Sequence, residues 1–318
     1  MTLGVCNPRG LKQGGFTSNL RPAKIIYSRR SCGVEMRRST CTLFCMLTAG
    51  ATGAIAIGPV VPAFALTQQD VDRCSGKGGV TPDQQISACT AVIQSGVYSG
   101  VDLAVAFNNR GTVYQDKRDD DHSIADYDQA IRLNPKYALA FYNRAWSYYR
   151  KKSYARAIAD YDKVIALDPK DAGAYLNRGN VYSAKGDLDR AISDYGEAIR
   201  IRPDDPSAFV NRCDELVQSG QAEAALADCN EALRLRPDHA GTFLLRGNAH
   251  FALGRFEQAA ADFDVVVRQN PKDVWALYGR GMAKVKKGNA ADGNVDIRAA
   301  KALLSDIEED FASFFELK

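Results

Sequence analysis

Histidine is scarce in this chain: it occurs three times in 318 residues, and none of the three recurs from repeat to repeat beside a plausible nucleophile or a pair of carboxylates. The sequence also lacks a phosphate-binding loop, a dinucleotide fingerprint and a metal motif, and its cysteines lack the Cys-x-x-Cys spacing of zinc sites. We therefore expect neither an enzyme nor a bound cofactor or metal.

A strong excess of positive charge is also lacking. The formal net charge is +3, but residues 1–65 hold eight of the 41 Lys and Arg residues and one of the 38 acidic residues, which leaves 33 basic and 37 acidic residues in the rest of the chain. At a formal charge of −4, that part lacks the attraction that nucleic-acid binding requires. We expect no nucleic-acid partner.

Long apolar runs are confined to the N-terminal segment. Arg37 and Arg38 precede an uncharged stretch that ends at Ala63-Phe64-Ala65, which is the pattern of a secretory signal peptide. We predict a signal peptide over residues 36–65 with cleavage after Ala65, and we interpret residues 1–35 as a non-native or extended leader. The mature protein would then be periplasmic or secreted, without stable membrane insertion. An uncleaved anchor and an organelle transit peptide are the alternatives.

The most regular feature is a series of equally spaced prolines, which marks an internal repeat: Pro135, Pro169, Pro203, Pro237 and Pro271. Each proline follows two stretches of helical apolar periodicity joined by a turn, and proline ends a helix. Each unit is therefore predicted to be a hairpin of two helices. The predicted units are residues 104–137, 138–171, 172–205, 206–239 and 240–273, followed by a degenerate sixth over 274–301.

Both ends of this array have predicted caps. Residues 66–103 contain a shortened hairpin of the same kind. Residues 302–318 are predicted to form a capping helix, because apolar residues recur at helical spacing from Ala300 to Phe315. A docking helix for a partner is the alternative.

Small residues fill two positions of every unit, and aromatic residues fill the gaps between hairpins. The phrases Phe-Tyr-Asn-Arg-Ala (141–145) and Tyr-Leu-Asn-Arg-Gly (175–179) illustrate the pattern. Over residues 104–301 the chain resembles the tetratricopeptide-repeat family, in a bacterial exported form. The resemblance implies an all-α solenoid, a right-handed superhelix of antiparallel helix hairpins. It also implies a concave groove, lined by the first helix of each hairpin, that binds protein or peptide.

An arginine and an aspartate recur at one constant separation in all six units, and we predict structural ion pairs between packed helices. The pairs are Arg110 with Asp126, Arg144 with Asp160, Arg178 with Asp194, Arg212 with Asp228, Arg246 with Asp262 and Arg280 with Asp296. The spacing leaves open whether each pair closes within a unit or between units. An anion-binding stripe is the alternative.

An asparagine precedes the arginine in the first four units, as Asn109, Asn143, Asn177 and Asn211, and Leu245 and Gly279 replace it in the last two. In family members that resemble the O-linked N-acetylglucosamine transferase, an asparagine ladder at this position binds the backbone of an extended peptide. The resemblance implies a peptide-binding groove over the first four units. Alternatively, asparagine is simply the commonest residue at this position of the repeat.

Aromatic residues add a second candidate recognition feature. Tyr142, Trp146 and Tyr149 share one face of a predicted first helix, away from its packing residues, and Asn180 adds a polar group in the next unit. Aromatic side chains combine apolar area with a polar tip, as binding hot spots require. The alternative is that Tyr142 and Tyr149 pack against neighbouring first helices.

Four cysteines follow Ala65, and they form two similar pairs. Cys213 and Cys229 occupy facing positions of one hairpin, and Cys74 and Cys89 occupy the equivalent positions of the N-terminal hairpin. We predict two disulfides, Cys74–Cys89 and Cys213–Cys229, which agree with export to an oxidising compartment. Buried thiol pairs are the alternative.

The sequence therefore favours a non-catalytic scaffold that binds an extended peptide or protein segment in the concave groove. The alternative is an accessory or regulatory subunit of a cell-envelope enzyme or export complex. The oligomeric state is left open.

Overall fold

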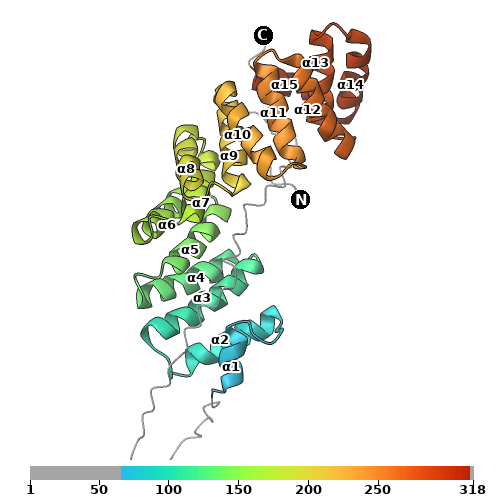
Figure 1. Ribbon diagram of the computed structural model, residues 1–318. Coiled ribbons are helices and arrows are strands. Elements are labelled where there is room, and N and C mark those ends of the chain that lie inside the picture. Colours follow the sequence, from blue (N-terminus) through green and yellow to red (C-terminus); the bar gives the residue numbers. More distant parts are fainter. Residues whose placement is uncertain (1–65, 316–318) are drawn as a thin grey trace, which may run out of the picture. The chain divides into compact units, whose positions relative to one another are not determined.

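A computed structural model describes residues 66–315, and all regular structure in this range is helical (Figure 1). The predicted leader, signal peptide and cleavage site lie almost entirely outside it. The chain divides into two compact units, and the division falls after Arg156. The described parts are residues 66–156 and 157–315.

The first compact unit contains α1 (Gln68–Cys74), α2 (Pro82–Gln94), α3 (Gly100–Asp116), α4 (Asp120–Leu133) and α5 (Ala138–Arg150). The division lies in the first turn of α6 (Tyr154–Leu167). The second compact unit continues with α7 (Ala172–Lys185), α8 (Leu188–Ile201), α9 (Pro206–Gln218), α10 (Ala222–Leu235), α11 (Ala240–Ala252), α12 (Phe256–Gln269), α13 (Val274–Lys286), α14 (Ala290–Leu303) and α15 (Ile307–Phe314).

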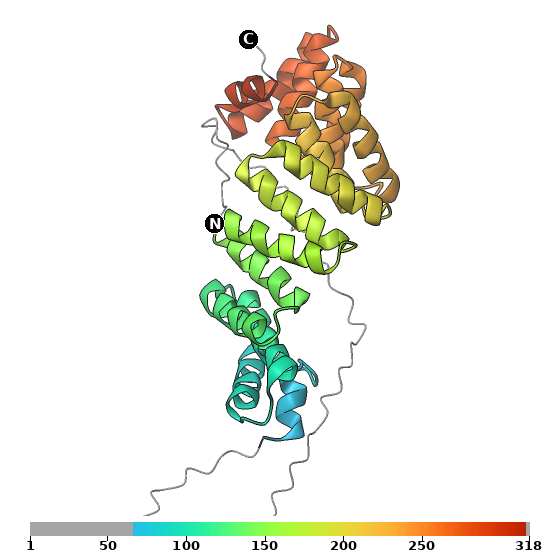
Figure 2. The ribbon, with the colours of Figure 1, turned by 90° about the vertical axis from the view of Figure 1, so that its left-hand side faces the viewer.

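Consecutive helices pack as hairpins, among them α3 on α4, α7 on α8 and α13 on α14 (Figures 1 and 2). The close approach depends on the small residues of the first helices. A Cβ added at Gly179 would lie 2.6 Å from the ring of Tyr195, and one at Gly247 would lie 2.7 Å from Phe263. These second-helix aromatic side chains are almost completely buried. The chain is an all-α tetratricopeptide-type solenoid.

The helix ends follow the same period. Asp171, Asp205 and Asp273 each stand shortly after a helix-ending proline and accept a backbone hydrogen bond as the N-cap of the next first helix. Within each of the six repeat hairpins, one residue of the turn adopts a positive φ, which glycine allows without steric cost. These turn residues are Arg118, Lys152, Gly186, Gly220, Gly254 and Gly288.

The ends of the array differ from the predicted boundaries. At the N-terminus, α3 begins at Gly100, inside the segment assigned to the capping hairpin. At the C-terminus, α14 extends to Leu303, and the terminal helix begins at Ile307 rather than at residue 302. A turn over residues 304–306 keeps the period of the repeat, but Ser305 stands where the other units have proline. A clear helix-stop signal is therefore missing from the sequence at this point.

The structure brings five of the six predicted Arg–Asp pairs together within their hairpins. In each, arginine Nε and Nη2 donate to the two carboxylate oxygens at 2.6–2.9 Å. The aspartates are 4–7% exposed. The sixth pair, Arg144 with Asp160, stays a prediction.

Most of these arginines also contact the preceding second helix. Arg178 Nη1 donates to Asp162 at 2.5 Å, and Arg280 Nη1 donates to Asp264 at 2.7 Å. Thr90, Asp128 and Asn230 accept in the same way from Arg110, Arg144 and Arg246. The arginines therefore bond both within and between hairpins, and the intra-unit and inter-unit alternatives are not exclusive.

Arg212 lacks this second contact within the described chain, because Gly196 stands at the position that holds the acceptor in the other hairpins. A Cβ at Gly196 would lie 3.4 Å from Arg212 Nη1, an ordinary contact distance. We predict that the Gly196→Asp variant is more stable than the Gly196→Asn variant, since only aspartate adds a charged acceptor. The difference in their free energies of unfolding should be about 0.5 kcal/mol. Urea unfolding of both variants at low salt measures the difference.

Salt provides the control for this prediction. At about 1 M NaCl the Debye length falls to roughly 3 Å, so the advantage of aspartate over asparagine should shrink. An advantage that persists unchanged at high salt, or that is absent at low salt, would contradict an ion pair with Arg212.

Candidate functional site

A shallow pocket lies on the first helices of the N-terminal compact unit. It has a volume of about 290 Å³ and is lined by Ser75, Gln85, Asn108, Asn109, Thr112, Leu139, Tyr142 and Asn143. We call the surface formed by positions 105, 108, 109, 112 and 115, and by their equivalents in later repeats, the first-helix face. Three predicted groove residues, Asn109, Tyr142 and Asn143, line this pocket.

Five lining residues were not predicted. Ser75 and Gln85 come from the N-terminal hairpin, where Gln85 Nε2 donates to the Cys74 carbonyl at 3.1 Å. Asn108 and Thr112 come from α3, and Leu139 comes from α5. The sequence does not point to Asn108, because Tyr142 and Leu176 occupy its position in the next repeats and asparagine therefore does not recur there.

Amide groups form much of the pocket floor. Asn143 Nδ2 donates to Asn108 Oδ1 at 3.1 Å, and Asn108 is buried. Asn109 is partly exposed and makes no side-chain hydrogen bond to any described residue. Leu139 is 38% exposed at the same place. The pocket therefore offers a free amide beside an exposed apolar side chain.

The other predicted asparagines lie in the second compact unit. Asn211 Nδ2 donates to Asn180 Oδ1 at 2.8 Å, and Asn180 Nδ2 donates to Asn177 Oδ1 at 3.4 Å. Asn180 also accepts from the Tyr195 hydroxyl at 2.9 Å, and Asn177 is only 5% exposed. Here the amides join neighbouring first helices to one another, so part of their hydrogen-bonding capacity is already used.

The three predicted aromatic residues fall into two places. Tyr142 lines the pocket, whereas Trp146 stacks on Tyr149 with ring centroids 5.3 Å apart. Tyr149 also packs against Tyr154 at 6.1 Å. Trp146 remains partly exposed.

The four cysteines are buried and paired. The structure places the sulfurs of each predicted pair at disulfide distance: Cys74 and Cys89 have a Cα–Cα distance of 4.5 Å, and Cys213 and Cys229 one of 5.7 Å. The first pair brings α1 and α2 together beside the pocket, where the Cys74 carbonyl accepts from Gln85 Nε2. The second lies within the hairpin of α9 and α10.

Four family models, described as TPR repeat or tetratricopeptide repeat, match residues 104–137, 147–186, 172–205, 210–274 and 244–293. The chain belongs to the tetratricopeptide-repeat family. Such repeats serve as protein-interaction scaffolds and are generally non-catalytic.

Solved structures of other tetratricopeptide-repeat proteins resemble this one. YrrB, described as having an unusual peptide-binding site, is 26% identical with a TM-score of 0.52, over 57% of this chain and 93% of its own. A Parabacteroides merdae repeat protein is 17% identical with a TM-score of 0.55, over 79% of this chain and 97% of its own. Pseudomonas aeruginosa PilF is also 17% identical with a TM-score of 0.55, over 68% of this chain and 100% of its own. A search of curated sequences finds no match.

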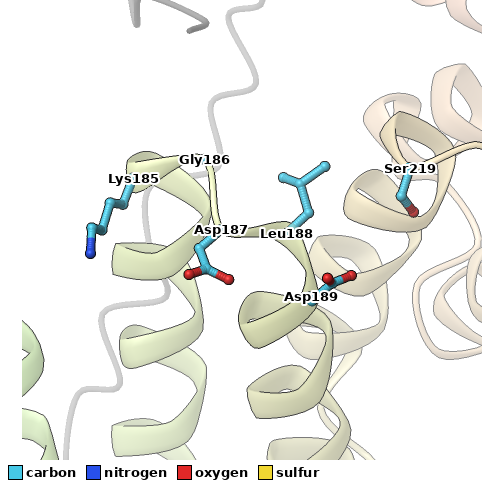
Figure 3. Close-up of a pocket in the computed structure, with 6 residues that line it drawn as sticks. All are labelled: Lys185, Gly186, Asp187, Leu188, Asp189 and Ser219. Carbon is cyan, nitrogen blue, oxygen red and sulfur yellow. The ribbon is translucent and has the colours of Figure 1, made fainter.

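A larger pocket, of about 430 Å³, lies at a hairpin turn of this tetratricopeptide-repeat protein (Figure 3). Lys185, Gly186, Asp187, Leu188, Asp189 and Ser219 line it. It contains no predicted site residue. The Asp187 carboxylate caps α8 and accepts from Arg190 Nε at 2.7 Å, so this carboxylate is already engaged.

The described residues hold no cluster of three or more potential metal ligands, and none of their helices is long and apolar enough to cross a membrane. His122 contacts Asp119 at 2.7 Å, and His239 contacts Thr242 at the same distance. Burial lowers the pKa of His250, whose Nε2 lies 4.0 Å from Asp262.

Sequence reasoning missed a buried acid on α9. Glu215 is 3% exposed, and its Oε2 has no hydrogen-bond partner among the described residues. Burial, together with the neighbouring Asp214 carboxylate, raises the pKa of Glu215 to about 7, although Ser183 opposes the shift. Burial raises the pKa of Asp214 as well. The sequence does mark this residue: Glu215 stands at a repeat position that holds the apolar residues Val181 and Ala249 in the adjacent repeats.

We predict that Glu215→Gln removes a pH-dependent loss of stability. An unfolded glutamate loses its proton near its ordinary pKa of 4.5, whereas folded Glu215 keeps it until about pH 7, so stability falls as pH rises through this window. Near pH 8 the free energy of unfolding of the variant should exceed that of the wild type by roughly 2–3 kcal/mol, whereas near pH 4.5 the two should differ little. Urea unfolding at both pH values measures the difference.

Glu309→Gln is the matched control, since it makes the same charge change at an exposed site that has no ion pair among the described residues. Its effect should vary little over this pH range. If both variants respond alike to pH, or if Glu215→Gln is destabilising at pH 8, the buried carboxyl does not control this pH dependence.

Proposed function

We propose that this protein is an exported scaffold that binds an extended peptide segment of a partner in the pocket on α3 and α5. The observation that carries the proposal is the combination of the partly exposed Asn109 amide with Leu139 and Tyr142 in one pocket. An amide offers both a donor and an acceptor to a peptide backbone. Leu139 and Tyr142 offer an apolar surface to an adjacent side chain.

The family and one relative support this choice. Tetratricopeptide repeats are protein-interaction scaffolds, and YrrB, at 26% identity, is described as having a peptide-binding site. The part-buried hydrogen bond between Asn143 and Asn108 keeps these two side chains in place before a peptide arrives. A preformed site lowers the ordering cost of binding.

The test uses a peptide selected against the full-length protein from a random peptide library. We predict that Asn109→Ala weakens its binding about 5-fold or more, for one lost backbone hydrogen bond. Tyr142→Ala should weaken it about 10-fold or more, because a packed aromatic contact is lost. Isothermal titration calorimetry measures both affinities.

Two further variants make the test specific. Asn294→Ala changes an exposed asparagine on α14 and should leave the affinity unchanged. Trp146→Ala removes the partner of Tyr149 and tests the second predicted aromatic feature separately. If Asn109→Ala and Tyr142→Ala bind the peptide as the wild type does while they remain folded, the pocket is not the binding site.

Export is supported by the signal-like sequence over residues 36–65 and by the two buried disulfides. We predict that the exported protein begins at Leu66 and that its four cysteines stay unreactive after unfolding without reductant. The chain-entropy model gives about 3 kcal/mol for closing loops of this size, so reduction should lower stability markedly. N-terminal sequencing and thiol titration measure the two outcomes.

A different first residue in the exported protein would contradict cleavage after Ala65. Four reactive thiols in the unfolded, unreduced protein would contradict both disulfides.

A further inference from the structure

The terminal helix α15 lies on the first helices of the last two hairpins. The ring of Phe311 packs against Phe251 of α11 at 5.2 Å, and against Trp275 and Tyr278 of α13 at 5.5 and 5.1 Å. Phe315 adds a contact to Phe251 at 4.9 Å. Phe311 is 1% exposed, so it is the central anchor of the helix.

The surface on which α15 packs is the first-helix face. Trp275 and Tyr278 occupy the positions that Leu139 and Tyr142 occupy in an earlier repeat, where the pocket lies. A repeating fold presents equivalent surfaces at equivalent positions. In its second compact unit, the protein therefore shows a short helix bound to the kind of surface that forms a pocket in the first.

Two features make α15 a weakly held occupant. It has only eight residues, and it has no side-chain hydrogen bond at its N-cap. Isolated helices this short are not stable in water, so packing by its phenylalanines must hold it. Phe314 contributes to this packing through Trp275, at 5.5 Å.

The occupied face also contains an unsatisfied polar group. Asn248 of α11 is fully buried, and neither atom of its amide has a hydrogen-bond partner among the described residues. Its counterpart Asn180 accepts from Asn211, but Gly279 stands where Asn248 would find the equivalent donor. Asn248 and Phe251 lie one helical turn apart, on one side of α11. An occupant that hydrogen-bonds this amide would fit better than α15.

We propose that the first-helix face of α11 and α13 is a docking site for an amphipathic helix from a partner protein that carries aromatic residues at positions i, i+3 and i+4. In the unbound protein α15 and the residue that follows it occupy this site through Phe311, Phe314 and Phe315, and the partner helix replaces them. The proposal concerns residues 157–315 and is independent of peptide binding on α3 and α5.

The probe for the test is a fluorescein-labelled synthetic peptide of residues 304–318, which has this aromatic spacing. It is titrated with full-length wild type and with the full-length variant Phe311→Ala/Phe314→Ala/Phe315→Ala, and anisotropy gives the affinity. Because the intact protein has its site filled, we expect the variant to bind at least about 10-fold more tightly. A peptide with the three phenylalanines replaced by alanine should bind neither protein.

The matched control is Glu309→Ala/Ser313→Ala, which changes two exposed residues of α15 and should behave as the wild type does. Trp275→Ala, combined with the triple variant, should abolish binding of the probe. Equal affinity of wild type and triple variant, or no binding by a triple variant that keeps the wild-type circular dichroism spectrum, overturns the proposal.

A second measurement needs no destabilising substitution. In the wild type, excess unlabelled probe should speed amide hydrogen exchange in α15, because the probe competes for the site. Exchange in α11 should not rise. Unchanged exchange in α15 at a probe concentration that saturates the triple variant overturns the proposal as well.

Discussion

The fold depends on buried arginine–aspartate pairs that recur in successive hairpins. Burying either charge alone would be costly, but the planar guanidinium satisfies both carboxylate oxygens at once, as Arg178 does with Asp194. The third nitrogen of the same guanidinium reaches Asp162 on the preceding hairpin. One side chain thus sets both the packing within a hairpin and the packing of that hairpin on its neighbour. Loss of one partner from such a buried pair typically costs about 3–5 kcal/mol.

The two kinds of contact that these arginines make tolerate change differently. The aspartate of the same hairpin is present in each described pair, because any other residue would leave a buried guanidinium without its bidentate partner. The acceptor on the preceding helix varies: Asp264 faces Arg280, and Asn230 faces Arg246. That position is more exposed, so water can replace a missing acceptor.

The sequence was enough to predict the hairpins, the column of ion pairs and the cysteines that lie together, because each depends on spacing that recurs from one repeat to the next. Residues that break the period were harder to predict. Gln85 reaches the pocket from a hairpin of different length, and Asn108 has no counterpart of its own type in later repeats. The asparagine column was recognised, but whether an amide points to a peptide or to the next helix depends on three-dimensional neighbours that the spacing does not specify.

One face of the repeat therefore serves different purposes along the chain, and single substitutions explain why. Where Asn143 follows Asn108, the amides bond to each other, Asn109 stays available and a pocket remains. Where Asn211 follows Asn180, the amides close a bond between first helices. Where leucine and glycine replace asparagine, the face becomes apolar and aromatic, and burying it needs a cover such as α15. An apolar face of this kind selects an occupant by shape and ring packing, whereas an amide-lined face selects it by backbone hydrogen bonds, so the two ends of the array suit ligands of different chemistry.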